Sequence, residues 1–367
     1  MSRPVVFIAG GGTGGHLMPA LALATQLRVT NPELEPFLVG ADRGVEAEVL
    51  PTRDFRHALL PMEPIYRRTW WRNARWPLVL GRLTGRLRQL FRDERPVAVL
   101  GTGGYASGPV VWWASRLRLP TAIQEQNAFP GLASRLLSRR VRHVYLGVPE
   151  ARVLLRPGPG TTFFDTGNPI TPPDPDRRRA ALLRLGLDPA RPVLLVTGGS
   201  QGSLAINRAV ATWLEQRSDA ERMWQVFWIA GRATYQEFSA LGNQDGVVVR
   251  DFQDPMADAY AVADLVISRA GMMTVAELCA WGLPAILIPL PTAASDHQTH
   301  NARVLEAAGA ACMLLQSTMD AAGLGPTLAP MLADAARRQQ MADLAGMRGR
   351  PDAARDIVSL FLTLLAS

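Results

Sequence analysis

One short stretch combines five glycines with a histidine: residues 10–16 have the sequence GGGTGGH. It follows an apolar run at residues 5–9, which predicts a buried strand, and precedes a helical pattern at residues 17–27. A helix N-terminus offers free N–H groups to an anion, and glycines let that anion approach. The helix dipole disfavours a charged His16, which predicts a neutral imidazole able to accept a proton. The glycine spacing also fits the dinucleotide-binding pattern GxGxxG.

Two further polar stretches follow predicted strands in the first half of the chain. Residues 97–100 lead into a second glycine turn at residues 101–105, and residues 121–124 lead into Glu125, Gln126 and Asn127. Ligands of parallel α/β sheets bind beyond the carboxyl ends of the strands, so we expect both glycine turns and residues 125–127 to converge on one cleft. Glu125 is a second candidate for a general base.

The second half of the chain repeats this pattern with other side chains. A predicted strand at residues 265–268 leads into the sequence RAGMMTVAE at residues 269–277. The free amides of Met272, Met273 and Thr274, at a helix N-terminus, predict a diphosphate site. Glu277 lies about one turn later and can accept hydrogen bonds from both hydroxyls of a ribose.

Strands alternate with helices along the chain, which predicts an α/β fold with parallel sheets. The 367 residues exceed one ordinary domain, and a composition rich in proline and glycine marks a boundary near residue 165. We expect two doubly wound, Rossmann-like domains that face a cleft, at residues 1–165 and 166–340, followed by a C-terminal segment at residues 341–367.

The composition is that of a globular protein, with 48% hydrophobic and 19% charged residues. Cys279 and Cys312 form neither a disulfide framework nor a metal-ligand pattern, which indicates a reducing cytosol. His297 and His300 lack a third ligand, so we expect no metal, and we expect no cofactor. We also expect no signal peptide and no membrane-spanning segment.

The net charge of +7 is concentrated in one segment. Residues 66–95 hold nine arginines and two acidic residues (9 − 2 = +7), so the remaining 30 basic and 30 acidic residues cancel. Five of the nine tryptophans lie in or near this segment. A nucleic acid could also bind a basic, aromatic surface, but no nucleic-acid-binding motif accompanies it, and we expect no such partner.

Taken together, the motifs resemble the bacterial MurG family, the UDP-N-acetylglucosamine:undecaprenyl-pyrophosphoryl-MurNAc-pentapeptide N-acetylglucosaminyltransferases. The motifs that resemble the family occur in the family's order, at residues 11–16, 101–105, 125–127, 167–169, 198–202, 269–277 and 296–301. It implies a GT-B glycosyltransferase architecture, with the lipid-linked acceptor in the first domain and most of UDP-GlcNAc in the second. It also implies that a final helix at residues 353–365 packs back on the first domain.

The resemblance implies roles for individual residues. Glu277 would hold the ribose, Gln298 the GlcNAc hydroxyls and the backbone at Gln253 the uracil. Further donor-side residues would be Ser200, Asn207, Met272, Met273, Thr274, Val275 and Ala276. The residues at the junction of donor and acceptor would be Thr13, Gly14, Gly15, His16, Tyr105 and Asn127.

Two positions depart from the family pattern. Thr171 stands where the family has an arginine that contacts the diphosphate, and Arg177 and Arg269 are the candidates to replace it. Gln253 stands where the family is apolar, so only its backbone contact is carried over.

The implied reaction is a single displacement with inversion at the anomeric carbon, with His16 as the first candidate base and Glu125 as the second. Three alternatives stay open. A dinucleotide-dependent oxidoreductase leaves the second domain's motif unexplained. A UDP-GlcNAc epimerase does not need a basic, tryptophan-rich face, and a membrane-docked nucleotide-sugar-binding subunit does not need a base.

The implied acceptor is tethered to a bilayer, so we expect peripheral attachment to an anionic membrane surface, at the cytoplasmic face of the bacterial plasma membrane and beside other cell-wall synthesis proteins. Residues 78–91 predict an amphipathic helix with an apolar stripe. The expected docking residues are Trp70, Trp71, Arg75, Trp76, Arg82, Leu83, Arg86, Leu87, Trp112 and Trp113. The competing interpretation is that the stripe packs on the domain core and the arginines are merely solvated.

Overall fold

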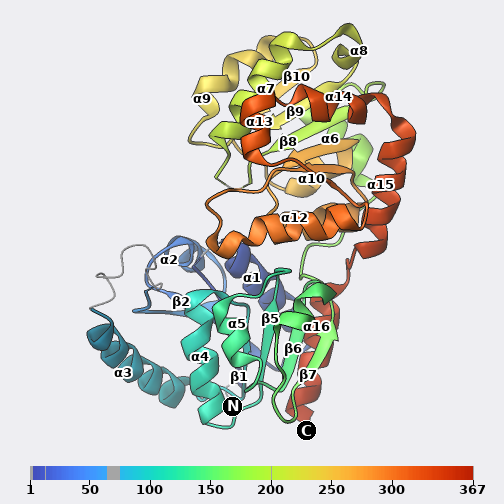
Figure 1. The fold of residues 1–367 in the computed structure, drawn as a ribbon. Coiled ribbons are helices and arrows are strands. Elements are labelled where there is room, and N and C mark those ends of the chain that lie inside the picture. Colours follow the sequence, from blue (N-terminus) through green and yellow to red (C-terminus); the bar gives the residue numbers. More distant parts are fainter. Residues whose placement is uncertain (1–2, 13, 64–74, 200, 367) are drawn as a thin grey trace. The chain divides into compact units, whose positions relative to one another are not determined.

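The computed structural model describes residues 3–12, 14–63, 75–199 and 201–366, and the chain divides into two compact units (Figure 1). Unit 1 comprises residues 1–171 and 352–367, and unit 2 comprises residues 172–351. Helix α15 (Ala335–Arg348) packs on α11 (Met272–Trp281) in unit 2. The C-terminal segment of unit 1 therefore begins at residue 352 and not at residue 341.

Within the described residues, unit 1 is built on a seven-stranded parallel sheet with the order β3-β2-β1-β4-β5-β6-β7. The strands are β1 (Val5–Ala9), β2 (Glu35–Ala41), β3 (Arg56–Leu60), β4 (Ala98–Gly101), β5 (Thr121–Glu125), β6 (His143–Leu146) and β7 (Thr162–Asp165). The α-helices are α1 (Gly14–Thr30), α2 (Val45–Val49), α3 (Trp76–Glu94), α4 (Gly104–Arg116), α5 (Leu132–Leu137) and α16 (Ala353–Ala366).

The central strands of unit 1 are apolar along their whole length because helices cover both faces of the sheet. Every residue of β1 and β4 is buried. Helix α16 packs against α1, and Ile357 and Phe361 join Leu17 and Leu23 in one buried cluster. The last helix of the chain thus completes the core of the first unit (Figure 1).

The predicted amphipathic helix forms as α3, but its apolar stripe faces the core of unit 1. Leu83, Leu87 and Phe91 are buried, and the Phe91 ring lies 5.1 Å from the Phe7 ring of β1 in an edge-on contact. The expectation that Leu83 and Leu87 dock on a membrane is therefore wrong, and the competing interpretation of the stripe is confirmed.

Unit 2 contains, in its described residues, a six-stranded parallel sheet with the order β10-β9-β8-β11-β12-β13. Its strands are β8 (Val193–Thr197), β9 (Gln225–Ile229), β10 (Val247–Arg250), β11 (Leu265–Ser268), β12 (Ala285–Leu287) and β13 (Cys312–Met313). Besides α11 and α15, its α-helices are α6 (Arg177–Leu185), α7 (Leu204–Gln216), α8 (Asp219–Arg222), α9 (Tyr235–Phe238), α10 (Met256–Val262), α12 (His297–Ala307), α13 (Gln316–Ala322) and α14 (Gly325–Ala333).

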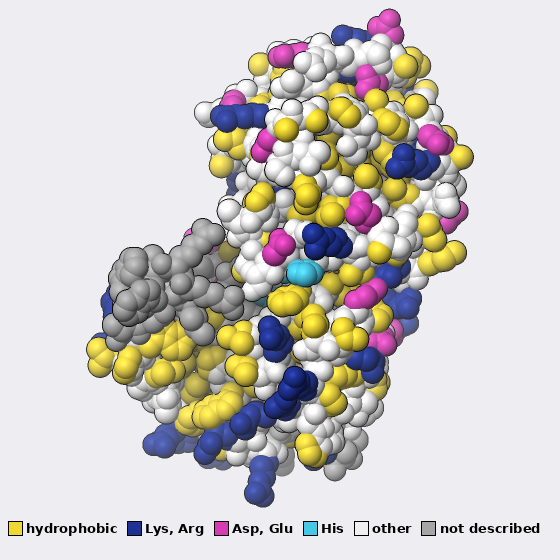
Figure 2. Space-filling model, viewed as in Figure 1, with side chains coloured by type: hydrophobic (Ala, Val, Ile, Leu, Met, Phe, Trp, Pro, Cys, Tyr) yellow, Lys and Arg dark blue, Asp and Glu magenta, His cyan; other side chains and the backbone are white. Residues whose placement is uncertain are grey.

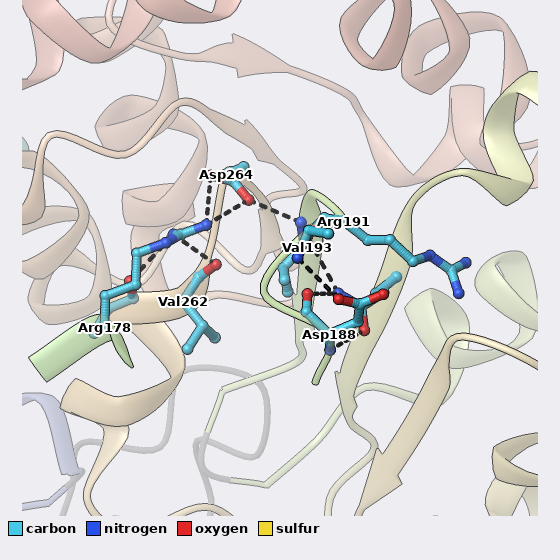
Figure 3. Close-up of polar contacts among 9 residues, drawn as sticks. Arg178, Asp188, Arg191, Val193, Val262 and Asp264 are labelled. Atoms are coloured by element: carbon cyan, nitrogen blue, oxygen red, sulfur yellow. Dashed lines mark hydrogen bonds and ion pairs between the residues drawn. The ribbon is translucent and has the colours of Figure 1, made fainter. Parts of the chain in front are cut away.

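A polar cluster at the start of the central strands holds α6 on the sheet of unit 2 (Figure 3). Both carboxylate oxygens of Asp264 accept from Arg178 Nη2 at 3.0 Å, and one of them also accepts from the Val193 N–H at 2.8 Å. Arg178 Nη1 donates to the Val262 carbonyl oxygen at 2.9 Å. These bonds fix the register of β8 beside β11.

Each sheet has one point where the strand order reverses. In unit 1 it lies between β1 and β4, and in unit 2 between β8 and β11. In doubly wound sheets, ligands bind beyond the carboxyl ends of the strands at such a switch point. Both predicted glycine turns of unit 1 and the 269–277 motif of unit 2 follow these strands.

Candidate active site

The two glycine turns of unit 1 lie against each other at the switch point. The last residues of β1 and β4 are register partners in neighbouring strands. The Thr102 hydroxyl donates to the His16 carbonyl oxygen at 2.8 Å. Gly104 has a φ of +77°, and a Cβ there would lie 1.8 Å from the Gly11 carbonyl oxygen, so only glycine allows this approach. The structure thus brings the two turns together, as the sequence predicted.

His16 lies in the first turn of α1, with its imidazole half-buried. Its Nδ1 lies 3.1 Å from the Thr102 carbonyl oxygen and 2.9 Å from Gln126 Oε1. Both of these oxygens accept hydrogen bonds, so Nδ1 carries the proton of the neutral imidazole and Nε2 keeps its lone pair. Within the described part of the chain, Nε2 has no hydrogen-bond partner. The imidazole is therefore prepared to accept a proton at Nε2.

Glu125, the last residue of β5, is 2% exposed and surrounded by donors. Its Oε1 accepts from the Asn127 N–H at 2.9 Å and from Asn127 Nδ2 at 3.3 Å. Its Oε2 accepts from the Gly131 N–H at 3.0 Å. Both carboxylate oxygens are thus engaged with donors from the loop that follows β5. Glu125 thus orders the loop that follows β5 and is a poorer base candidate than His16.

The other residues expected at the site in unit 1 differ in their exposure. Tyr105 packs its ring on the first glycine turn, where a Cβ at Gly12 would lie 2.7 Å from the Tyr105 ring. Gly14 and Gly15 begin α1 and reach the surface, and Thr171 is exposed. Thr13 lies outside the described residues.

In unit 2, α11 begins directly beyond the switch point with free amides. Gly271 is its N-cap, and the first backbone bond of the helix runs from the Val275 N–H to the Gly271 carbonyl oxygen at 3.0 Å. The N–H groups of residues 272–274 precede that bond and so have no partner within the helix. Val275 itself is 1% exposed, so its side chain belongs to the core. Ala276 is half-buried.

Glu277 lies one turn into α11 and is held by one neighbour. Tyr260, from α10, donates its hydroxyl to Glu277 Oε2 at 2.8 Å. Burial raises the pKa of Glu277, and the hydrogen bond from Tyr260 opposes that shift. Among the described residues, Oε1 has no hydrogen-bond partner and remains able to accept from a ligand hydroxyl.

Gln298 and Gln253 of unit 2 each make one hydrogen bond within the protein through their side-chain amide. Gln298 Oε1 accepts from the Leu290 N–H at 3.0 Å, and its Nε2 has no hydrogen-bond partner among the residues that the structure describes. Gln253 follows β10 and donates its Nε2 to the Pro255 carbonyl oxygen at 3.2 Å. Ser200 lies outside the described residues.

Asn207 does not face a ligand. It is 0% exposed on α7, and its Nδ2 donates to the Ala230 carbonyl oxygen at 2.8 Å and to Thr234 Oγ1 at 2.9 Å. Its Oδ1 accepts from Trp228 Nε1 at 3.0 Å. The expectation that Asn207 binds substrate is wrong, because its amide is used to join α7 to the β9 strand.

Both arginines proposed to replace the missing diphosphate contact at Thr171 have hydrogen-bond partners within unit 2. Arg177 Nε donates to Asp258 Oδ1 at 2.6 Å. Arg269 Nη1 donates to the Ile288 and Pro289 carbonyl oxygens at 3.2 and 3.1 Å, and its Nη2 donates to Ser203 Oγ at 2.7 Å and to Gln316 Oε1 at 2.8 Å. Both guanidinium groups stabilise unit 2 internally.

The expected docking surface is only partly exposed. Leu78 and Leu80, outside the buried stripe of α3, are 72% and 47% exposed, and Trp112 of α4 is 40% exposed. Figure 2 shows hydrophobic side chains over α3 and arginines along the same face of unit 1. Arg75, Arg82 and Arg86 are exposed, whereas Trp76 and Trp113 are half-buried. Trp70 and Trp71 lie outside the described residues.

The sequence did not single out Gln124 as part of the site. The available signal was an amide side chain inside a fully buried strand, because such an amide needs hydrogen-bonding partners. Among residues 3–12, 14–63, 75–199 and 201–366, no group of His, Cys, Asp and Glu side chains could hold a metal ion. No helix within the same residues is long and apolar enough to cross a membrane.

Family models match most of the chain. The glycosyltransferase family 28 N-terminal domain matches residues 6–146, and the glycosyltransferase family 28 C-terminal domain matches residues 193–357. A UDP-N-acetylglucosamine--N-acetylmuramyl-(pentapeptide) pyrophosphoryl-undecaprenol N-acetylglucosamine transferase from Limosilactobacillus fermentum is 35% identical over 98% of this chain and 98% of its own. The protein of the same name from Anaeromyxobacter dehalogenans is 38% identical over 98% of this chain and 93% of its own.

Solved structures agree with these relatives. MurG from Acinetobacter baumannii superposes with a TM-score of 0.76 at 26% identity and covers 98% of this chain and 99% of its own. The UDP-GlcNAc 2-epimerase from Neisseria meningitidis reaches a TM-score of 0.64 at 14% identity over 99% of this chain and 100% of its own, which shows the shared fold alone. The expected GT-B architecture of two Rossmann-like domains is confirmed. The chain belongs to glycosyltransferase family 28 and, within it, to the MurG family of N-acetylglucosamine transferases.

Proposed function

We propose that this protein transfers N-acetylglucosamine from UDP-GlcNAc to the 4-hydroxyl of MurNAc in undecaprenyl-pyrophosphoryl-MurNAc-pentapeptide (lipid I), giving lipid II for peptidoglycan synthesis. The names of its relatives supply the donor and the acceptor. The observation that carries the chemistry is the His16 imidazole at the switch point of unit 1, beside two glycine turns. Its Nδ1 contacts two acceptor oxygens, and its Nε2 has no hydrogen-bond partner in the described part of the chain.

Unit 2 is the proposed donor-binding unit. The amides of Met272, Met273 and Thr274 bind the diphosphate at the N-terminus of α11. Glu277 Oε1 accepts from the ribose, and the free Nε2 of Gln298 donates to a GlcNAc hydroxyl. The backbone at Gln253 meets the uracil.

The proposed reaction is a single displacement. His16 Nε2 takes the proton of the MurNAc 4-hydroxyl while that oxygen forms a bond to the anomeric carbon of GlcNAc. The bond from the anomeric carbon to the phosphate oxygen breaks, and UDP leaves with the electron pair. The free amides at the start of α11 meet the charge that develops on the leaving phosphate. Attack from the side opposite UDP inverts the anomeric configuration.

The protein is further proposed to reach its acceptor by docking on the anionic, cytoplasmic surface of the bacterial plasma membrane. Leu83 and Leu87 are buried and do not belong to the docking face. Among the described residues, the exposed candidates for contact with the membrane are Leu78, Leu80, Trp112, Arg75, Arg82 and Arg86. Tryptophan favours the headgroup level, and arginine favours an anionic surface. Other cell-wall synthesis proteins are proposed partners there.

Release of UDP from UDP-GlcNAc, measured with and without the lipid-linked MurNAc acceptor, tests the proposed function. The transferase releases UDP only when the acceptor is present. An epimerase converts the sugar nucleotide without the acceptor, a binding subunit releases no UDP, and an oxidoreductase requires a dinucleotide. Any of these three results would contradict the proposal.

A further inference from the structure

A chain of buried amide side chains connects His16 with the far side of β5. It runs from His16 through Gln126 and Gln124 to Asn168, and these three amides are 2%, 0% and 2% exposed. Buried amides of this kind must satisfy both ends, so each one restricts the orientation of the next. The orientation of the amide at one end of the chain therefore fixes the orientation of the amide at the other end.

The Gln126 backbone carbonyl fixes the orientation of the first amide, because a carbonyl oxygen can only accept a hydrogen bond. Asn168 Nδ2 donates to it at 3.2 Å, so Asn168 Oδ1 faces Gln124 and accepts from Gln124 Nε2 at 2.8 Å. Gln124 Oε1 is then turned toward Gln126 and accepts from Gln126 Nε2. Gln126 Oε1 is thereby left facing His16 Nδ1, at 2.9 Å.

A second backbone carbonyl fixes the same direction at the other end. Gln126 Nε2 also donates to the Thr102 carbonyl oxygen at 2.7 Å, and His16 Nδ1 lies 3.1 Å from that oxygen. If the Gln126 amide were reversed, its oxygen would face two other acceptors, the Thr102 carbonyl and Gln124 Oε1. The network is therefore satisfied in one orientation only.

Two glycines make room for this network. A Cβ at Gly147 would lie 2.3 Å from Asn168 Oδ1, and a Cβ at Gly103 would lie 2.8 Å from His16 Nδ1. Gly103 has a φ of +89°, in the left-handed region that favours glycine. Both ends of the amide chain thus lie directly against backbone that carries no side chain.

We propose that Gln126, held by Gln124 and Asn168, is a positioning residue that fixes His16 in the Nδ1–H tautomer and so directs the lone pair of Nε2 toward the acceptor hydroxyl. This inference rests on the proposed function of His16. When Nε2 takes the hydroxyl proton, the Nδ1–H of the imidazolium remains bonded to Gln126 Oε1 and the Thr102 carbonyl, whose partial negative charges stabilise the new positive charge.

The tautomer can be observed directly in the wild-type protein. Protein labelled with ¹⁵N in its histidines is recorded by long-range ¹H–¹⁵N NMR, and the His16 signals are assigned by their loss in His16→Asn. We expect Nδ1 protonated and Nε2 unprotonated. In free histidine the Nε2–H tautomer prevails, so protonated Nε2 and bare Nδ1 in neutral His16 would overturn the proposal without any need for a variant to fold.

The variant Gln126→Glu tests the role of Gln126. A carboxylate beside Nδ1 favours the imidazolium, so at a pH where the wild-type imidazole is neutral we expect both nitrogens of His16 protonated and kcat lowered about tenfold or more, with the KM for UDP-GlcNAc unchanged. Gln26→Glu, on the same helix as His16, is the matched control and should behave as wild type.

Unchanged His16 signals and unchanged kcat in Gln126→Glu would overturn the positioning role. Failure of the proposed function has a different signature, because wild-type protein would then release no UDP on addition of acceptor whatever the tautomer of His16.

Discussion

At the scale of single residues, His16 and Glu125 lie at the same edge of one sheet but in opposite environments. The carboxylate of Glu125 accepts from three donors, whereas His16 Nε2 has no partner among the residues that the structure describes. The environment of each group, more than its residue type, favours His16 as the proposed base and Glu125 as the residue that orders a loop.

Replacement of His16 by alanine should lower kcat about 10²- to 10⁴-fold, the usual contribution of a general base, and leave the KM for UDP-GlcNAc unchanged. His57→Ala, on β3 of the same unit, is the control and should keep wild-type kcat. Steady-state kinetics with a saturating acceptor measure both constants. Near wild-type turnover in a folded His16→Ala protein, together with loss of turnover in Glu125→Gln, would transfer the role of base to Glu125.

Glu277 should show opposite effects on stability and on donor binding. Burial raises the pKa of Glu277 in the folded state above its value in the unfolded state. The stability of unit 2 therefore declines as the pH rises from the unfolded-state pKa to the folded-state pKa. At higher pH the stability stays at this lower level. Glu277→Gln removes that charge and keeps an acceptor for Tyr260. At neutral pH we expect an equal or higher Tm.

The same variant should raise the KM for UDP-GlcNAc about tenfold to hundredfold, because a hydrogen bond to a charged group contributes about 1.5–3 kcal/mol. Glu237→Gln, exposed on α9 of the same unit, is the control. A lower Tm with an unchanged donor KM would show that Glu277 is a structural residue.

The sequence predicted that the glycine turns lie together at the strand ends, but not which of their polar side chains face inward. Glycine turns and strand ends leave a local pattern, so the positions of His16, Glu125 and Glu277 could be predicted. The buried partners of Asn207 and Arg269 come from segments far away in the chain, such as Trp228 and Ile288, and no local pattern indicates them.

At the scale of elements, the central strands could be predicted and the short peripheral ones could not. Strands β1 and β11 match the predicted ranges because they are apolar runs between turn residues. Strands β3 and β7, at the two edges of the sheet in unit 1, were not predicted, since they contain charged and exposed residues such as Arg56 and Asp165. Strand β6 was not predicted either, although its four residues are buried or half-buried. Pairing with a neighbour, and not local sequence, establishes them.

Helix α3 shows the limit of an amphipathic pattern, which predicts a helix with an apolar face but not what covers that face. Leu87→Ala should lower the free energy of unfolding by about 2–5 kcal/mol, as expected for a buried leucine. Leu80→Ala, on the exposed side of the same helix, should change it by less than about 0.5 kcal/mol. Denaturant titrations compare the two, and equal effects would contradict the observed packing.

At the scale of the whole molecule, the charge distribution predicts how the protein reaches a bilayer. The protein should sediment with anionic vesicles but not with neutral ones, and salt should weaken the binding. Changing Arg75, Arg82 and Arg86 together to Glu should abolish sedimentation, because each basic residue contributes about 1 kcal/mol near an anionic surface.

Changing three exposed arginines of unit 2 to Glu, namely Arg179, Arg303 and Arg337, makes the same change in net charge and serves as the control. If the two triple variants bind anionic vesicles equally, unit 1 does not carry the docking face.

The configuration of the newly formed glycosidic bond tests the central claim most directly, because a single displacement on an α-linked sugar nucleotide must give a β-linked product. The disaccharide lipid formed from UDP-GlcNAc and the lipid-linked MurNAc acceptor is isolated, and the coupling between H1 and H2 of the transferred GlcNAc is measured by NMR. We expect the large coupling of a β-linked GlcNAc on the 4-oxygen of MurNAc. The small coupling of an α-linkage, or the absence of a disaccharide, would contradict it.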